Sequence, residues 1–113
     1  MNKNPTKPKH LQKETAAWWL SVVKEWELED HHVRLLTLAA EAWDRACGAR
    51  EILDKQGMTF IDRWDQPKAR PEVAIERDSR IAFARLVREL DLDTGQQKEA
   101  RPPGLVSNTK GSA

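Results

Sequence analysis

The sequence is poor in several features that mark common classes of protein. It has 113 residues, with no tyrosine, two phenylalanines and a single cysteine, Cys47. One cysteine cannot form an internal disulfide, which suits a reducing compartment. No apolar run approaches the roughly 18–20 residues that span a bilayer, and Met1 to Lys9 lacks the apolar stretch of a signal peptide. We therefore expect a cytoplasmic protein.

The residue patterns of common catalytic sites are also missing. There is no glycine-rich phosphate loop with its lysine, and no Cys/His set has the spacing of a zinc site. Asp30, His31 and His32 form a cluster, but adjacent side chains on a helix point about 100° apart, so we interpret the cluster as a capped helix start. His10 lies in a lysine-rich terminus without a nucleophile nearby. We expect no enzyme activity, no metal and no cofactor.

Charge is distributed unevenly along the chain. Residues 1–13 hold four lysines and no acid, whereas residues 14–56 hold nine acids against five bases. The body is thus mildly acidic, and the last twenty residues are again basic. Two interpretations stay open: the basic ends attract phosphate, or they keep the chain soluble.

The clearest pattern is helical periodicity in two neighbouring segments. A helix over about 13–26, for which Thr15 is a possible cap, has a wide apolar face made by Trp18, Trp19, Val22, Val23 and Trp26. A second helix over about 31–56 begins after Asp30 as N-cap and ends at Gly57. It carries two apolar stripes, Leu35, Leu38, Ala42, Ala46, Ala49 and Leu53 in one, and Leu36, Ala40, Trp43 and Cys47 in the other. Cys47 is expected to be a buried small residue.

Residues 58–70 break the helical pattern. Thr59 and Ile61 alternate with Phe60 and Trp64, which predicts a short hairpin or an extended loop. This connection is longer than most between helices, so it is a candidate contact surface. Trp64 either anchors a partner or folds back over the helices, and the second alternative is favoured.

Pro71 begins a third predicted helix, over about 71–91. One face is apolar and contains Ile75, Ser79, Ala82, Phe83, Leu86 and Leu90. The opposite face carries Arg77, Arg80, Arg85 and Arg88. These arginines either clamp phosphates or carboxylates, or form a solvated face with local pairs to acids, and the solvated face is favoured. The local acids are Glu76, Asp78 and Glu89.

The predicted fold is all-α. An N-terminal helical hairpin (13–26 and 31–56) is followed by a loop and a third helix, within a domain over 13–93 that lies between disordered tails at 1–12 and 94–113. The apolar faces exceed what one small unit can bury, so copies are expected to associate. The candidate core and oligomer residues are Trp18, Trp19, Trp26, Leu36, Ala42, Trp43, Ala46, Leu53, Phe83 and Leu86.

Taken in order, these marks resemble the short, all-helical family of phage terminase small subunits. The resemblance covers about residues 10–93. It rests on Trp19, Leu28 with Asp30, Leu36, Trp43, Gly57, Pro71, the Ile75-Glu76-Arg77 run and the Leu86–Leu92 end.

The resemblance implies a non-catalytic subunit that forms a homo-oligomeric ring, recognises double-stranded viral DNA and regulates the large ATPase/nuclease subunit in the cytoplasm of the bacterial host. The DNA-binding candidates are Lys3, Lys7, Lys9, Lys13, Arg77, Arg80, Arg85 and Arg88. Two other functions stay open: a DNA-binding regulator of helix-turn-helix type, which the long second helix disfavours, and a protein-interaction adaptor that uses Trp64.

Overall fold

The computed structural model describes residues 5–91, and three helices dominate it. They are α1 (Lys13–Glu25), α2 (Asp30–Gln56) and α3 (Pro71–Leu90), and a two-stranded sheet of β1 (Thr59–Ile61) and β2 (Pro67–Ala69) joins the last two. The predicted all-α class is confirmed. The first and last residues of each helix lie within one residue of the predicted positions. Among the described residues, no helix has the length and apolar character needed to cross a membrane.

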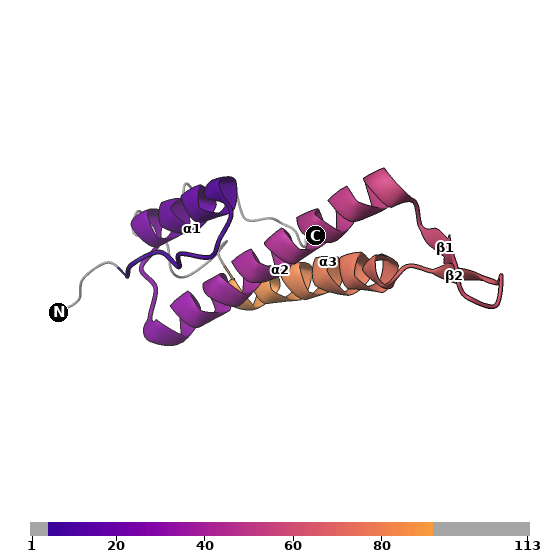
Figure 1. Cartoon of the computed structure of the whole chain (residues 1–113). Coiled ribbons are helices and arrows are strands. Elements are labelled where there is room, and N and C mark those ends of the chain that lie inside the picture. Colours follow the sequence, from indigo (N-terminus) through magenta and orange to yellow (C-terminus); the bar gives the residue numbers. More distant parts are fainter. Residues whose placement is uncertain (1–4, 92–113) are drawn as a thin grey trace, which may run out of the picture.

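The most extensive packing between two elements is that of α2 against α3, which run antiparallel along most of their length (Figure 1). Small side chains on α2 make this possible, because they let the two backbones come close. The buried residues on this side of α2 are Ala39, Ala42, Ala46, Ala49 and Leu53, and Ser79 is buried on α3. The predicted hairpin of the first two helices is present as α1 against α2, but its contact is the smaller of the two.

The core lies where α1, the first half of α2 and the end of α3 meet. Trp19, Leu36 and Leu90 are its largest fully buried side chains. The indole N–H of Trp19 donates a hydrogen bond to Oγ1 of Thr37 on α2, 3.1 Å away, so the one polar atom of this buried ring is satisfied. Burial of these apolar side chains holds α1 against α2 and the end of α3.

The folded part begins before α1, which corrects the prediction of a disordered tail through residue 12. Leu11 is buried in the core, His10 Nε2 lies 2.8 Å from Glu41 Oε2, and the backbone N–H of Gln12 donates to Asp44. A single apolar residue among lysines gave too weak a pattern to reveal this attachment. The predicted tail at 94–113, and Leu92 and Asp93 before it, lie outside the described residues.

The helix ends follow simple local rules, with one shift of register. Gly57 ends α2 with a φ of 83°, as expected of a glycine C-cap, and Pro71 is the first residue of α3. At the start of α2 the N-cap is Glu29, and the predicted cap Asp30 is the first helical residue. The Glu29 backbone N–H donates to Nδ1 of His32 at 3.2 Å, so this histidine helps to close the helix start.

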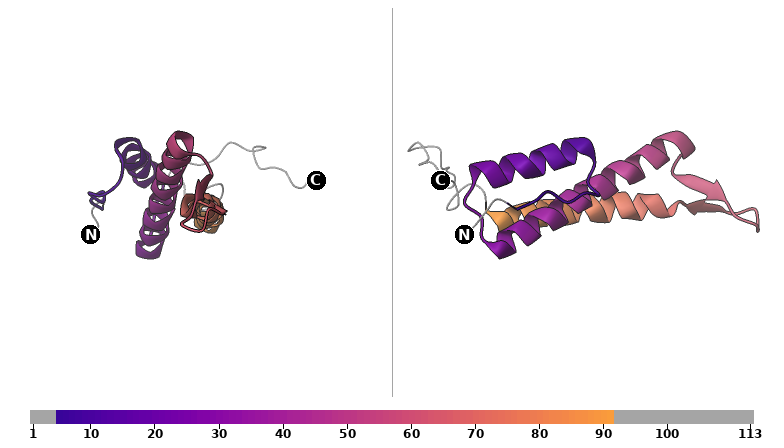
Figure 2. Two further views of the ribbon diagram at one scale, coloured as in Figure 1. Left: turned by 45° about the vertical axis from the view of Figure 1, so that its right-hand side comes forward. Right: turned by 60° about the vertical axis from the view of Figure 1, so that its left-hand side comes forward.

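The segment between α2 and α3 is an ordered β-hairpin that projects beyond the ends of the two helices (Figure 1), as a second view in Figure 2 also shows. Thr59 pairs with Ala69, and Ile61 with Pro67. At the turn, Oδ1 of Asp62 accepts hydrogen bonds from the backbone N–H groups of Trp64 and Gln66, at 2.8 and 2.9 Å. This aspartate turn fixes the tip of the hairpin.

Candidate macromolecular interface: an aromatic groove and a projecting hairpin

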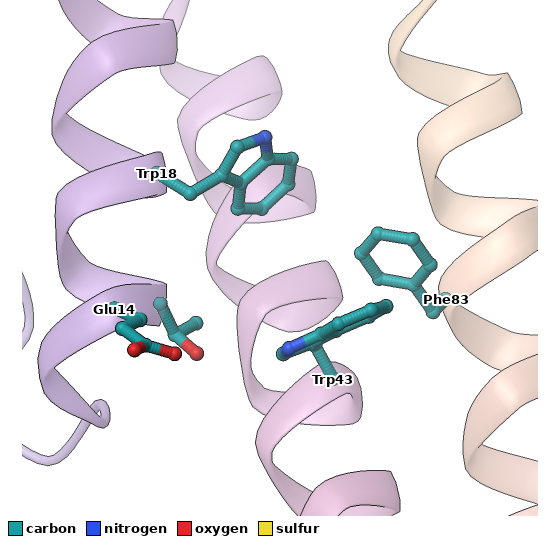
Figure 3. A pocket seen from close by; sticks show the side chains of 5 residues that line it. Glu14, Trp18, Trp43 and Phe83 are labelled. Carbon is teal, nitrogen blue, oxygen red and sulfur yellow. The ribbon is translucent and has the colours of Figure 1, made fainter.

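Three aromatic side chains, one from each helix, line a groove on the flank of the molecule (Figure 3). The ring of Phe83 on α3 lies 5.9 Å from the ring of Trp18 on α1 and 5.0 Å from that of Trp43 on α2, measured between centroids. Both pairs are tilted, an arrangement that aromatic rings favour. Trp43 is nevertheless 48 % exposed, so half of its large apolar surface faces solvent.

Trp43 was a candidate for the core or for an oligomer contact, and the structure does not bury it in the core. On α2, Leu36 and Ala40 face the core shared with α1, while Ala42 and Ala46 are buried on the side of α3. Trp43 falls between these two faces. Its neighbour in the sequence, Asp44, binds the start of α1. Because α1 begins there, it does not cover the part of α2 that follows Asp44. The indole is left at the edge of the core.

The groove continues along α2 and α3 as a second hollow that shares Trp43 and Phe83, with charged side chains beside its apolar lining. Here the carboxylate of Glu76 on α3, only 12 % exposed, joins two guanidinium groups. It lies 3.5 Å from Arg50 on α2 and 3.1 Å from Arg80 on its own helix. Arg50 also pairs with Asp54 at 2.9 Å. Both arginines are therefore largely neutralised by neighbouring acids.

Further carboxylates surround the same groove. Glu14 and Glu51 line it, and neither forms an ion pair within residues 5–91. Partial burial raises the pKa of the Cys47 thiol, and the charges of Asp44, Glu51 and Glu14 raise that pKa further, against a smaller opposite effect of Arg80. Acidic side chains thus outnumber basic ones around the groove. Cys47 itself is exposed on its wall, which corrects the expectation that it is buried.

The hairpin forms a second apolar surface, at the far end of the molecule. Met58 and Ile61 are exposed, and Trp64 is 70 % exposed. The expectation that Trp64 folds back over the helices is therefore wrong. The guanidinium of Arg63 lies 5.1 Å from the centre of the Trp64 ring, a cation–π arrangement, and it has no acidic partner in the described chain. The tip presents an aromatic ring between a guanidinium, that of Arg63, and the exposed carboxylate of Asp65 in the sequence.

The predicted DNA-binding residues do not form one surface. Arg77 lies 3.1 Å from Asp78, and Arg80 pairs with Glu76 at the groove. These two arginines therefore form local pairs with acids, which is the alternative that the sequence favoured. Arg85 and Arg88 on α3 are exposed and, in the part of the chain described, have no acidic partner. Lys7, Lys9 and Lys13 are exposed, and Lys3 lies outside the described residues.

The candidate core and oligomer residues divide into three groups. Trp19, Leu36, Ala42, Ala46 and Leu53 are buried. Trp26 and Leu86 are half-buried, Trp26 against the core cluster. Trp18, Trp43 and Phe83 meet in the groove, where they keep surface available to a partner.

Sequence reasoning missed the groove's charged residues. Glu14, Arg50 and Glu51 look like ordinary charges of solvent-facing helix positions. An i,i+4 spacing does predict the Arg50–Asp54 pair, but the contact of Arg50 with Glu76 depends on how α2 and α3 pack.

Within residues 5–91 no group of three or more His, Cys, Asp or Glu side chains is arranged to hold a metal ion. Comparison of the chain with protein-family models, with curated proteins and with solved structures finds no match, so the resemblance to small terminases rests on the residues that carry it.

Proposed function

We propose that this chain is a non-catalytic, self-associating DNA-binding protein that acts as the small subunit of a viral DNA-packaging terminase. In this role it recognises genome DNA and regulates the large ATPase/nuclease subunit. The family assignment comes from the resemblance of the sequence. The exposed apolar surface supports self-association, and the distribution of unpaired positive charge supports DNA binding.

The observation that carries the proposal is the amount of apolar surface that one copy leaves uncovered. Ten large hydrophobic side chains of the described chain are exposed, among them Trp43 in the groove and Trp64 on the hairpin. Single exposed apolar residues are ordinary, but patches of several aromatic and aliphatic side chains mark interaction surfaces. The groove and the hairpin are two such patches, and contact with other copies would bury them.

Unpaired cations support the DNA-binding part. Arg85 and Arg88, with Lys7, Lys9 and Lys13, give one copy a few phosphate contacts and hence weak binding. An assembly that holds several copies against one duplex multiplies this attraction, because each further contact becomes intramolecular. A chain with a formal charge of only +1 therefore needs assembly in order to bind DNA well.

The test combines light scattering with DNA binding on the full chain. We expect a mass several times 13.0 kDa, and binding of duplex DNA that weakens steeply as salt is raised. We also expect a large terminase subunit from the same genome to be retained on the immobilised assembly. A stable monomer at high concentration without affinity for duplex DNA would exclude the proposal.

A second function, a protein-interaction adaptor, is favoured by one observation, the exposure of Trp64 on an ordered tip. Exposed tryptophans are frequent anchors of protein interfaces. This function predicts a monomer whose hairpin binds a different protein and whose affinity for DNA is negligible. The same two measurements separate it from the first proposal.

A further inference from the structure

The groove and the hairpin of one molecule cannot meet. From Cys47 in the groove to Gln56, α2 rises by about 13 Å, at about 1.5 Å per residue. The hairpin then continues beyond the helix ends, away from the groove (Figure 1). Any contact between these two surfaces is therefore a contact between two copies.

The two surfaces fit one another in shape and polarity. The groove consists of two adjoining hollows of about 320 and 420 Å³, a size that in other proteins accommodates a bulky apolar group. The hairpin offers such a group in Trp64, and Ile61 is exposed on the same hairpin. Aromatic rings in the groove can pack on an inserted indole as Phe83 already packs on Trp43.

Unpaired side chains of opposite charge are also present on the two surfaces. Arg63 stands beside Trp64 without an acidic partner in the described chain, while Glu14 and Glu51 at the groove are carboxylates without a cation there. The groove's own arginines do not oppose this match, because Glu76 and Asp54 already pair with them. Residues 5–91 thus contain an aromatic groove bordered by unpaired carboxylates and an aromatic tip that carries one unpaired guanidinium, that of Arg63, with the carboxylate of Asp65 on the far side of Trp64 in the sequence.

The tip is held in shape before it meets a partner. Both hydrogen bonds to Asp62 Oδ1 lie within the turn, so little conformational freedom remains to be lost on docking. A preformed tip and an open groove are what a rapid, specific contact between folded copies requires.

From these observations we infer that the β1–β2 hairpin of one copy inserts into the Trp18–Trp43–Phe83 groove of the next copy, with Trp64 on the aromatic rings and Arg63 beside Glu14 and Glu51. This inference rests on the self-association in the proposed function and states which surfaces make it. The contact joins two different surfaces, so it is heterologous, and its repetition produces a ring when the rotation between copies closes.

The native cysteine provides the first test. In the variant Gln66→Cys the new thiol lies on the hairpin tip, and Cys47 lies on the groove wall. Because the two positions are much farther apart within one chain than the roughly 7 Å that a disulfide can span between Cα atoms, mild oxidation can join them only between copies. We expect covalent dimers and longer ladders on a non-reducing gel.

Two controls make this result specific. Gln66→Cys combined with Cys47→Ser should give no ladder, and neither should Ala17→Cys, which places a thiol on an exposed position of α1 outside the groove. If the Gln66→Cys protein has a multi-copy mass but no ladder, the hairpin–groove contact is wrong and self-association stands. If the protein is a monomer, self-association itself fails, and the inferred contact fails with it.

A mixing experiment tests the head-to-tail arrangement. Trp43→Ala removes part of the groove, and Trp64→Ala removes the tip. Each variant alone should show an interface dissociation constant raised about tenfold or more, as expected for a central tryptophan of an interface. A mixture retains one intact groove and one intact hairpin, so it should form a 1:1 dimer of about twice 13.0 kDa. Leu38→Ala, exposed outside the groove, should leave assembly unchanged.

If Trp43→Ala fails to fold, the same contact can be tested by exchanging two charges across it. Glu51→Arg and Arg63→Glu should each weaken assembly, and the double variant should restore it, since both side chains are exposed and neither supports the core. Circular dichroism verifies that each variant is folded. Additive weakening without rescue, or a mixture that stays monomeric, would overturn the inferred contact.

Discussion

Asp44 on α2 holds the start of α1 through Thr15. One carboxylate oxygen accepts a hydrogen bond from the Thr15 hydroxyl, and the other accepts one from the backbone N–H of Gln12 at 2.8 Å. The sequence suggested Thr15 as the cap of its own helix, whereas its hydroxyl binds a side chain of the next helix. A single aspartate thus acts as a cap supplied from another element.

We predict that Asp44→Ala lowers the free energy of unfolding by about 1–2 kcal/mol, the usual effect of losing a helix cap and leaving polar groups unpaired. Asp54→Ala on the same helix removes only an exposed i,i+4 pair with Arg50 and should change stability by about 0.5 kcal/mol or less. Urea denaturation compares the two. Equal effects would show that the contact of Asp44 with α1 is unimportant.

A second prediction uses two leucines on α2. Leu36 is fully buried beside Trp19, whereas Leu38 is 51 % exposed. Leu36→Ala should reduce the free energy of unfolding by about 2–5 kcal/mol, because it leaves a cavity in the core. Leu38→Ala should change it by about 0.5 kcal/mol or less. Similar losses for both variants, measured by chemical denaturation, would place the core elsewhere.

The third prediction concerns DNA binding by α3. Replacing Arg85 and Arg88 with alanine should weaken binding of duplex DNA at every sequence and make it less dependent on salt. The slope of log affinity against log salt should fall by roughly 0.9 for each phosphate that the protein no longer neutralises. Arg77→Ala is the matched control, because this guanidinium already pairs with Asp78. Fluorescence anisotropy over a salt series measures both, and equal effects would contradict separate roles for these arginines.

Thiol chemistry provides a fourth prediction. Because partial burial and nearby carboxylates raise the pKa of Cys47, less of it is thiolate near neutral pH than in an ordinary cysteine. Its reaction with a maleimide or an aromatic disulfide should be slow at pH 7 and should accelerate only at higher pH than for a free thiol. Glu51→Gln removes one of the charges that raise this pKa, so the rate profile should shift to lower pH. An unchanged profile would show that Glu51 does not act on the groove.

The last prediction separates the shape of the hairpin from the stability of the fold. Asp62→Ala removes the acceptor that fixes the turn, so the hairpin should loosen and self-association should weaken, while the unfolding midpoint changes little because the hairpin is exposed. Asp62→Asn keeps an oxygen acceptor and should retain most of the association. Loss of global stability with Asp62→Ala would mean that the hairpin supports the helices as well.

The helices could be predicted from the sequence because their signals are local. Apolar spacing marks α1, α2 and α3, and Gly57 and Pro71 mark the ends that the structure confirms. The short strands could also be predicted in part, since the alternation of residues from Thr59 to Ile61 indicated a hairpin as one of two alternatives.

What lay beyond prediction depends on how the elements pack. A helical stripe shows that Trp43 and Cys47 share a face, but it cannot show that α1 begins beside Asp44 and leaves that face open. Leu11 is one apolar residue beside lysines, so its burial has no periodic signal. The contact of Arg50 with Glu76 is set by the approach of α3 to α2.

The hairpin stands at the end of a long helical rod and is joined to it only at Gly57 and Arg70. Such an arm converts a small turn of the backbone at its root into a large displacement of its tip. The number of copies in a closed assembly would then be decided by bond rotations at the base of the arm, far from the residues that touch. Sequences that differ only there would be expected to build circles of different circumference from the same contact.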